Sequence, residues 1–350
     1  MKKWEIFLGT GLFFCYYGKK EKGSNGMGTF WIMLKNVLIF VLLAVPGYVL
    51  VKSKKLQSKS SGILSCVLTY AGMPCLILSS TLKLEFTAQN TVTMLLTALL
   101  GAALTAGMYF ISAFLVNKKD PVKTKGIMRF AMIFANNGFI GIPLARAVFG
   151  ENSPVMMYLI VLNILNNALM FTVGVYLISG DKKTISLKKA VVNPVLLAFF
   201  AGVLMKALGM GSDFAEQNVL PELQTYATHF SNIVTPISMV VLGMKLAEVP
   251  LRKLFTSGKM YWAAAMRLVV YPVLCVGAIL LLRLIPGLNI SRDMIMGFFV
   301  AFAMPTAGLA SVFSDQYDGD AEGAAIFTLG STLLSVITIS ALYWALGMIV

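Results

Sequence analysis

Residues 135–144 read Ala-Asn-Asn-Gly-Phe-Ile-Gly-Ile-Pro-Leu and interrupt a long apolar run. This stretch places amides, glycines and a proline in the middle of a segment that is otherwise suited to crossing a membrane. Pro143 lacks an amide hydrogen, and Gly138 and Gly141 favour unwinding, so we expect the helix to break here. The freed backbone groups must then face protein or a wet cavity, because lipid cannot satisfy them. The stretch predicts a helix ending near Asn136, an unwound crossing, and a second half-helix starting near Pro143.

A second break of the same kind lies at residues 303–311, which read Ala-Met-Pro-Thr-Ala-Gly-Leu-Ala-Ser. Here Pro305 interrupts the run. Each second half-helix would direct its N-terminal amides toward the bilayer centre, and a helix N-terminus favours anions. We therefore predict an anion site where the two breaks meet. Its candidate residues are Asn136, Asn137, Gly138, Gly141, Pro143, Pro305, Thr306, Ala307 and Gly308.

Composition extends this interpretation to the whole chain of 350 residues, which is 58% hydrophobic and only 13% charged. Soluble domains are about 45–50% apolar and about 25% charged, so a soluble globule is excluded. A membrane-spanning helix needs roughly 20 apolar residues. Runs of that kind lie near 30–51, 62–81, 91–116, 125–149, 154–179, 190–210, 224–247, 260–284, 293–315 and 322–348. They do not alternate as β-barrel strands do, so we predict an all-α polytopic membrane protein with ten transmembrane helices.

The two halves of the chain resemble each other. Pro74 and Pro236 interrupt the second and seventh runs, just as the longer breaks interrupt the fourth and ninth. Five spans per half make the second half enter the membrane from the opposite side. Inverted repeats with matched broken helices are typical of secondary transporters. We expect a first repeat at 30–180 and a second at 181–350.

Residues 1–29 fit no span, because their apolar part is too short to cross the bilayer. They form a non-spanning extension, either on the membrane surface or disordered, or else translation starts at Met27. A signal peptide is a further interpretation, although the cleavage pattern is not clear.

Charge predicts the orientation of the spans. The chain has 29 basic and 15 acidic residues, a net charge of +14, and lysines concentrate in alternate connections between spans. The positive-inside rule makes these connections cytoplasmic, so both termini would lie outside the plasma (inner) membrane of a bacterium. The excess charge is then no sign of nucleic-acid binding. The acidic stretch at 315–322 would lie inside and Arg292 outside, against the general pattern.

Other polar residues inside spans have two interpretations each. Asn163, Asn166 and Asn167 share one helix face, where they line a cavity or bond neighbouring helices. Arg146 and Arg267 lie near span ends, so we expect their side chains to reach the interface. The candidate cavity-lining residues are Asn163, Asn167, Thr235 and Ser335.

The sequence favours no enzyme, metal or cofactor. It has one histidine, His229, and four scattered cysteines with no paired spacing. Asp318-Gly319-Asp320 superficially matches an aspartyl-protease motif, but no partner aspartate lies in another span. His229 either relays protons or is a structural residue.

The motifs resemble the auxin efflux carrier family, whose bacterial members are often called malate or malonate permeases. The resemblance covers residues 30–350 and rests on 136–144, Phe149-Gly150, 303–307, Met73-Pro74 and Thr235-Pro236. It implies two inverted repeats, a scaffold part and a transport part, and a substrate site at the crossover of the broken helices. In plant members an asparagine at the position of Asn136 contacts the substrate carboxylate, and Pro305 matches the second crossover proline. The plant proteins also carry an acidic residue on the third span, which this chain lacks.

The sequence therefore predicts a secondary transporter that moves a small organic anion, such as a dicarboxylate, across the bilayer by alternating access. The alternative is a sodium-coupled symporter of the bile-acid type, which has a similar repeat plan. A channel is a further option. Coupling to a proton or to sodium, and assembly as a homodimer, are left open.

Overall fold

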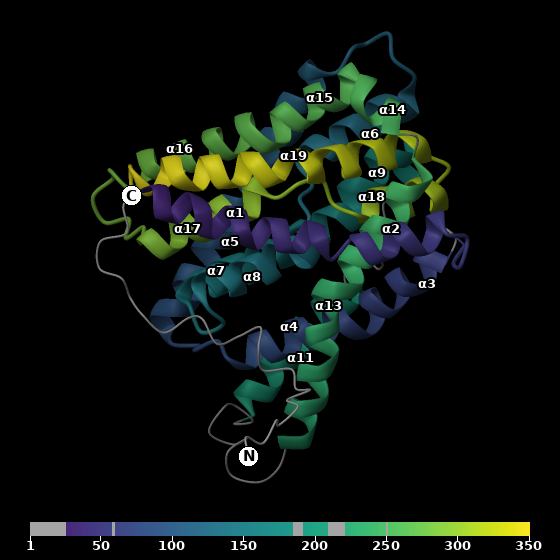
Figure 1. Ribbon diagram of the computed structural model, residues 1–350. Coiled ribbons are helices and arrows are strands. Elements are labelled where there is room, and N and C mark those ends of the chain that lie inside the picture. The colour runs from purple at the N-terminus through teal and green to yellow at the C-terminus, as the bar shows by residue number, and fades with distance from the viewer. Residues whose placement is uncertain (1–25, 58–59, 185–191, 209–220, 250) are drawn as a thin grey trace, which may run out of the picture.

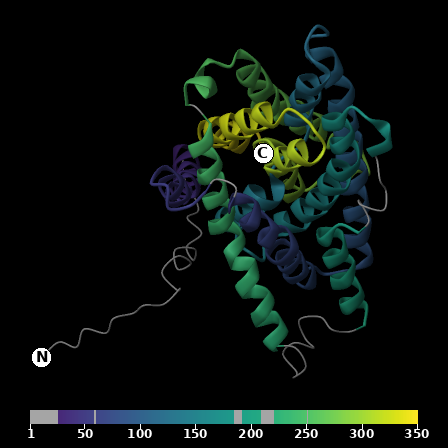
Figure 2. The ribbon, with the colours of Figure 1, turned by 90° about the vertical axis from the view of Figure 1, so that its right-hand side faces the viewer.

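The structure is a computed structural model that describes residues 26–57, 60–184, 192–208, 221–249 and 251–350. Within these ranges the regular structure is helical, apart from one isolated β-bridge. Most of the predicted N-terminal extension, residues 1–25, lies outside the described residues. The helices gather into one elongated bundle, from which the ends of α11 and α13 project (Figures 1 and 2).

The elements of the first half are α1 (Gly26–Leu42), α2 (Val45–Lys52), α3 (Ser60–Val67), η1 (Leu68–Gly72), α4 (Met73–Leu82), α5 (Ala88–Leu115), α6 (Val122–Ile133), η2 (Asn137–Gly141), α7 (Ile142–Phe149), α8 (Pro154–Leu169), η3 (Met170–Gly174), α9 (Val175–Ser179) and η4 (Lys182–Thr184). Those of the second half are α11 (Pro194–Ala207), α13 (Pro221–Glu248), α14 (Leu251–Thr256), α15 (Gly258–Ala265), η5 (Met266–Val270), α16 (Tyr271–Leu282), α17 (Arg292–Ala303), α18 (Leu309–Gln316) and α19 (Ala321–Gly347). The turns η1, η2, η3 and η5 are π-helical, and η4 is a short 3₁₀ helix.

Among the described residues, six continuous helical stretches are long and apolar enough to cross a membrane. They are Ser60–Leu82, Ala88–Leu115, Pro154–Ser179, Thr225–Glu248, Gly258–Leu282 and Ala321–Gly347. The prediction of an all-helical membrane protein is therefore confirmed. The remaining predicted spans are shorter or interrupted: α1 with α2, α6 with α7, α11, and α17 with α18. The count of ten crossings and the division at residue 180 stay predictions.

Three prolines enter these helices directly after a π-helical turn. Pro74, Pro143 and Pro272 each occupy the second position of an α-helix that follows η1, η2 or η5. A π turn shifts the hydrogen-bond register by one residue, which lets the chain accept a proline without ending the helix. Pro236 instead lies inside the continuous helix α13.

The helices pack in two groups. Helix α13 packs along α2 and α4, and α11 packs on α4. In the other group α17 packs on α8 and α16, while α5 packs on α8 and α6. Helix α19 contacts α13 of the first group and α6 of the second, so it lies between the two groups.

The contact between α2 and α13 depends on two glycines. A Cβ on Gly47 would lie 2.0 Å from the Val240 carbonyl oxygen, and one on Gly243 would lie 1.8 Å from the Ala44 carbonyl oxygen. The two backbones therefore touch directly, as in other membrane helix pairs that meet through small residues.

We expect Gly243→Ala to destabilise the protein by about 2 kcal/mol or more, because the added methyl group must push two backbones apart. Thermal unfolding of the purified protein in detergent measures the effect. Gly277→Ala on α16 is the matched control, since a Cβ there meets nothing within 4 Å. Equal unfolding midpoints for the two variants would contradict this packing.

Candidate functional site

The two predicted breaks lie against each other. Ala135 and Thr306 form an antiparallel β-bridge. The amide of Asn136 donates to the Pro305 carbonyl at 2.8 Å, and the amide of Ala307 donates to the Phe134 carbonyl at 3.0 Å. The unwound segments thus satisfy part of each other's backbone, as a non-helical segment inside a membrane requires.

The first break differs from its prediction in one respect. Helix α6 ends at Ile133, and the second half-helix begins at Asn137 with the π turn η2, not near Pro143. The Asn136 carbonyl accepts from the amides of Ile140 and Gly141, which starts this turn. The second break follows its prediction, since α17 ends at Ala303 and α18 begins at Leu309.

Arg267 ties the ends of both first half-helices together. Its side chain is 1% exposed. Its Nε donates to the Met304 carbonyl at 2.9 Å and its Nη1 to the Ile133 carbonyl at 2.9 Å. Weaker contacts at 3.4 Å reach the carbonyls of Met132 and Ala301. A cation at two helix C-termini satisfies carbonyls that have no partner within the helix.

The expectation that Arg267 reaches the membrane interface is therefore wrong. It lies in the turn η5, midway between α15 and α16, where two helix ends surround it. Sequence position alone did not reveal that these ends converge on the guanidinium.

Side chains hold the rest of the crossover backbone. Asn166 donates its Nδ2 to the Ala135 carbonyl at 3.0 Å and accepts from the Ala135 amide at 3.4 Å. The hydroxyl of Thr306 donates to the Ala131 carbonyl at 3.0 Å, and its amide donates to Ser331 Oγ at 3.1 Å. These contacts make Asn166 and Thr306 supports of the crossover.

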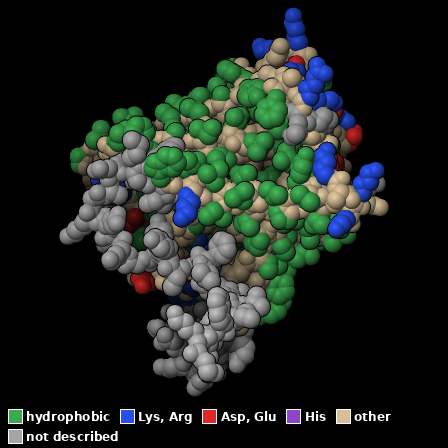
Figure 3. Space-filling view, in the orientation of Figure 1, with side chains coloured by type: hydrophobic (Ala, Val, Ile, Leu, Met, Phe, Trp, Pro, Cys, Tyr) green, Lys and Arg blue, Asp and Glu red, His purple; other side chains and the backbone are tan. Residues whose placement is uncertain are grey.

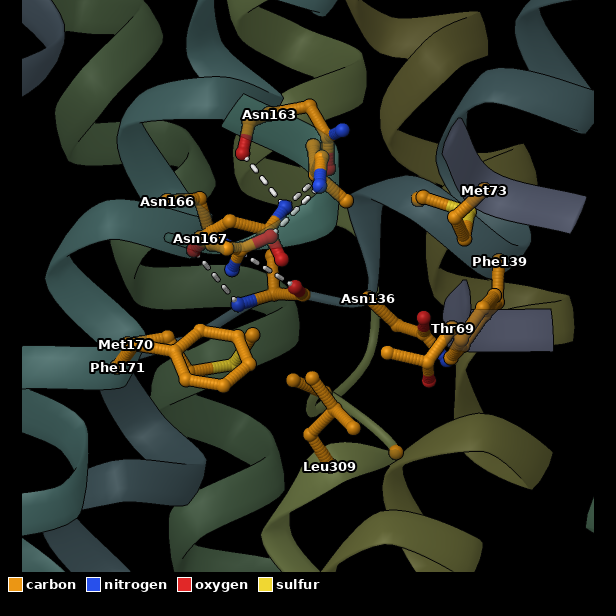
Figure 4. Close-up of a pocket in the computed structure, with 16 residues that line it drawn as sticks. Thr69, Met73, Asn136, Phe139, Asn163, Asn166, Asn167, Met170, Phe171 and Leu309 are labelled. Carbon is orange, nitrogen blue, oxygen red and sulfur yellow. Dashed lines mark hydrogen bonds between the residues drawn. The ribbon is translucent and has the colours of Figure 1, made fainter. Parts of the chain in front are cut away.

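A cavity of about 460 Å³, counting space open to solvent, lies beside the crossover. It is lined by Thr69, Met73, Ala135, Asn136, Gly138, Phe139, Asn163, Asn166, Asn167, Met170, Phe171, Asn193, Val195, Ala307, Gly308 and Leu309. Figure 4 shows Asn163, Asn166 and Asn167 on one side of the cavity, with Met73 and Phe139 on the other.

Some of the predicted site residues line this cavity and others do not. Those that line it are Asn136, Gly138, Asn163, Asn167, Ala307 and Gly308. The predicted residues outside its lining are Asn137, Gly141, Pro143, Pro305, Thr306, Thr235 and Ser335. Ser335 bonds the Thr332 carbonyl within its own helix, and Thr235 lies next to Pro236 on α13.

Amide groups dominate the polar part of the lining. Asn167 Nδ2 donates to the Asn163 carbonyl at 2.8 Å and to its Oδ1 at 3.1 Å. The Nδ2 atoms of Asn163 and Asn193 are buried without a hydrogen-bond partner among the described residues. In the part of the chain that the structure describes, no residue that lines the cavity is charged. The site therefore offers free amide donors in a largely apolar wall.

Asn193 was missed by sequence analysis. Its Oδ1 accepts from the Val195 amide at 2.8 Å, so it caps the N-terminus of α11. An asparagine directly before a proline is the usual signal for such a cap. The sequence shows this cap but not that the remaining amide nitrogen stays unpaired beside the cavity.

A polar network connects the two groups of helices at one end. Arg146 donates to Ser231 Oγ and Ser80 Oγ, each at 3.2 Å, and its Nη2 lies 3.3 Å from Glu151 Oε1. Lys83 Nζ lies 2.9 Å from the same carboxylate oxygen. Partial burial raises the pKa of Glu151, but the hydrogen bond from Lys83 and the charges of Arg146 and Lys83 outweigh it and leave the pKa below its usual range.

This network gives a pH prediction. Since the folded-state pKa of Glu151 is lowered, its ionised form stabilises the folded protein above the unfolded pKa of about 4.3, and this stability is lost as the pH falls through the folded value. We expect Glu151→Gln to flatten the decline of the unfolding midpoint between about pH 5 and about pH 3. Melting curves of both proteins over that range measure it, and parallel curves would contradict the role of the carboxylate.

Comparison with known proteins bears on the whole chain. A family model described as membrane transport protein matches residues 32–187 and again 182–343, so the match falls in two repeated halves. A transporter of Methanothermobacter thermautotrophicus is 26% identical over 311 residues, covering 87% of this chain and 95% of the relative. A protein of Rhizobium meliloti, provisionally named a malonate transporter, is 24% identical over 318 residues, covering 88% and 94%.

Proposed function

Because the chain belongs to the membrane transport protein family, that of the auxin efflux carriers, we propose that it is a secondary active transporter for a small organic anion. The observation that carries this proposal is the antiparallel contact of the two helix breaks beside an amide-lined cavity. Matched broken helices at the midplane are the best pointer to a transporter's binding site.

The chemistry of the cavity favours a carboxylate. The N-terminal ends of η2 and α18 start on either side of the crossover, and a helix N-terminus carries roughly half a positive charge. The unpaired amide nitrogens of Asn163 and Asn193 would donate to carboxylate oxygens. Asn136 lies at the meeting point and adds a further amide. The substrate-binding residues are thus those predicted at the crossover that line the cavity, together with Asn193.

We infer a dicarboxylate of three or four carbons from the placement of the donors. Unpaired amides come from two separate helices, α8 and the N-terminus of α11, which suits two carboxylate groups on one small molecule. The name of the Rhizobium relative supports malonate as the first compound to try. Malate is the second.

The packing of the helices in two groups supports a proposal of alternating access. We assign α2, α3, α4, α11 and α13 to a scaffold. The helices that carry the two breaks, α6 with α7 and α17 with α18, move against it. The ten crossings form two inverted repeats, and the lysine-rich end faces the cytoplasm of a bacterial cell with both termini outside. The acidic connection between α18 and α19 supports a shared face for the loops at this end, because Asp318 pairs with Lys123 at 2.6 Å and Glu322 pairs with Lys253.

Flux into proteoliposomes tests the proposal. The purified chain is reconstituted and supplied with malonate, malate and monocarboxylates, each with and without sodium and with and without a proton gradient. We expect saturable uptake of a carboxylate that unlabelled substrate inhibits. A strict requirement for sodium would favour the symporter of the bile-acid type, and large unsaturable currents would favour a channel. No uptake of any carboxylate would overturn the assignment.

A further inference from the structure

A second cavity lies at the lysine-rich end, apart from the crossover. It is a cleft of about 760 Å³, counting space open to solvent, between the end of α5, the start of α6 and the end of α9. The residues that line it are Ala113, Val116, Lys118, Val122, Lys125, Gly126, Arg129, Tyr176, Leu177 and Gly180. It shares no lining residue with the crossover cavity.

Of the residues that the structure describes, three cations line this cleft and no acidic residue does. Arg129 donates to Ser112 Oγ at 3.1 Å and to the Tyr109 carbonyl at 3.0 Å, both neutral acceptors. Lys125 donates to the Lys118 carbonyl at 3.3 Å, also a neutral acceptor. Among the described residues, none of the three cations is within ion-pair distance of a carboxylate.

Other lysines near this end behave differently. Lys123 pairs with Asp318, Lys253 with Glu322, and Lys259 with Asp120 at 2.7 Å. Carboxylates are therefore present at this end, yet they are engaged outside the cleft. The cleft retains an uncompensated positive charge, which is what an anionic ligand requires.

The rim of the cleft is apolar and exposed. Val122 is 65% exposed, and Ala113, Val116 and Leu177 form the rest of the apolar wall. Figure 3 shows most of the visible Lys and Arg side chains at one end of the molecule and many hydrophobic side chains on the flank. Because the cleft combines lysines of this end with an apolar wall, we expect it to lie near the depth of lipid head groups.

We propose that this cleft binds the phosphate group of an anionic phospholipid, with Lys118, Lys125 and Arg129 around the phosphate and the acyl chains along the apolar rim. Basic pockets between membrane helices bind anionic head groups in this way. Arg129 is already oriented by Ser112 and by the Tyr109 ring, whose centroid lies 4.6 Å from the guanidinium carbon. A free phosphate ion would contact the same three cations but would not contact the apolar rim.

Thermal unfolding of the full chain in detergent micelles tests this site. Phosphatidylglycerol, phosphatidylcholine and inorganic phosphate are added in separate series. We expect phosphatidylglycerol alone to raise the unfolding midpoint, with an effect that salt weakens. The K118Q/K125Q variant should need about tenfold more of this lipid for the same shift, since each basic residue near an anionic head group contributes to binding.

A matched variant separates the cleft from general surface charge. Lys54 and Lys55 are exposed lysines in the connection after α2 and do not line the cleft, so K54Q/K55Q removes the same charge elsewhere. The matched variant should respond to phosphatidylglycerol as the unaltered protein does. An equal response of K118Q/K125Q and K54Q/K55Q would overturn the site. So would an equal shift by phosphatidylcholine, and a shift by inorganic phosphate equal to that by phosphatidylglycerol would overturn the assignment to a lipid.

Discussion

Replacing Arg267 by methionine is expected to lower the stability of the protein by about 2–4 kcal/mol and to abolish transport. The guanidinium makes its two shortest hydrogen bonds, both 2.9 Å, to the carbonyls of Ile133 and Met304. Methionine fills a similar volume but leaves both carbonyls unpaired in a dry interior, at a cost of about 1–3 kcal/mol each. The substitution also removes the desolvation penalty of burying a charge, which offsets part of this cost.

The consequence for transport follows from where these carbonyls lie. Ile133 ends α6 and Met304 directly follows α17, so Arg267 holds both half-helices at the crossover. Without it the two unwound segments would no longer keep a fixed spacing. Unfolding midpoints in detergent and flux in proteoliposomes measure the two effects separately.

Two further variants make this prediction specific. Arg283→Met changes an exposed arginine at the end of the same helical stretch and should leave stability and flux unchanged. Arg267→Lys keeps the charge but not the planar fork of donors, so it should recover only part of the lost stability. An Arg267→Met protein as stable and active as the unaltered chain would refute the role of this residue.

The sequence located both breaks because their cause is local. Pro305 ends α17 at the expected place, since a proline removes a backbone donor wherever it stands. The predicted start of the second half-helix near Pro143 is wrong, because a π turn already begins at Asn137. This turn lets the proline join an existing helix. A helix register of that kind depends on the neighbouring segment and leaves no pattern in the sequence.

The sequence does not predict which distant segments come together, and the reason is a different one. Arg267 binds carbonyls 134 and 37 positions away in the chain, and nothing local to Arg267 signals them. The same holds for Asn193, whose cap on α11 is predictable while its unpaired nitrogen beside the cavity is not. The ion pair between Asp318, in the acidic stretch before α19, and Lys123 likewise joins residues that are distant in the sequence, so no local pattern predicts it.

Replacing Asn136 by alanine is expected to weaken substrate binding about 10- to 100-fold while leaving the fold intact, because hydrogen bonds to charged groups contribute about 1.5–3 kcal/mol. The backbone of Asn136 carries its structural contacts, through the Pro305 carbonyl and the amides of Ile140 and Gly141. Among the described residues its side-chain amide has no protein partner. Substrate-induced shifts of the unfolding midpoint and the KM of flux measure the loss. Asn166→Ala is the contrast, since Asn166 supports Ala135 and its loss should cost stability.

The substitution Asn136→Asp decides between an anion and a cation at the crossover. The new side chain has nearly the same shape, so a change in binding reports charge and not packing. A carboxylate placed beside a carboxylate substrate repels it, and we expect transport to fall further than in Asn136→Ala as long as the aspartate is ionised. A bound sodium ion would instead be favoured by the added negative charge. Retained or tighter binding in Asn136→Asp, together with a sodium requirement, would therefore reject an anion at this position, whereas a loss greater than that of Asn136→Ala supports it.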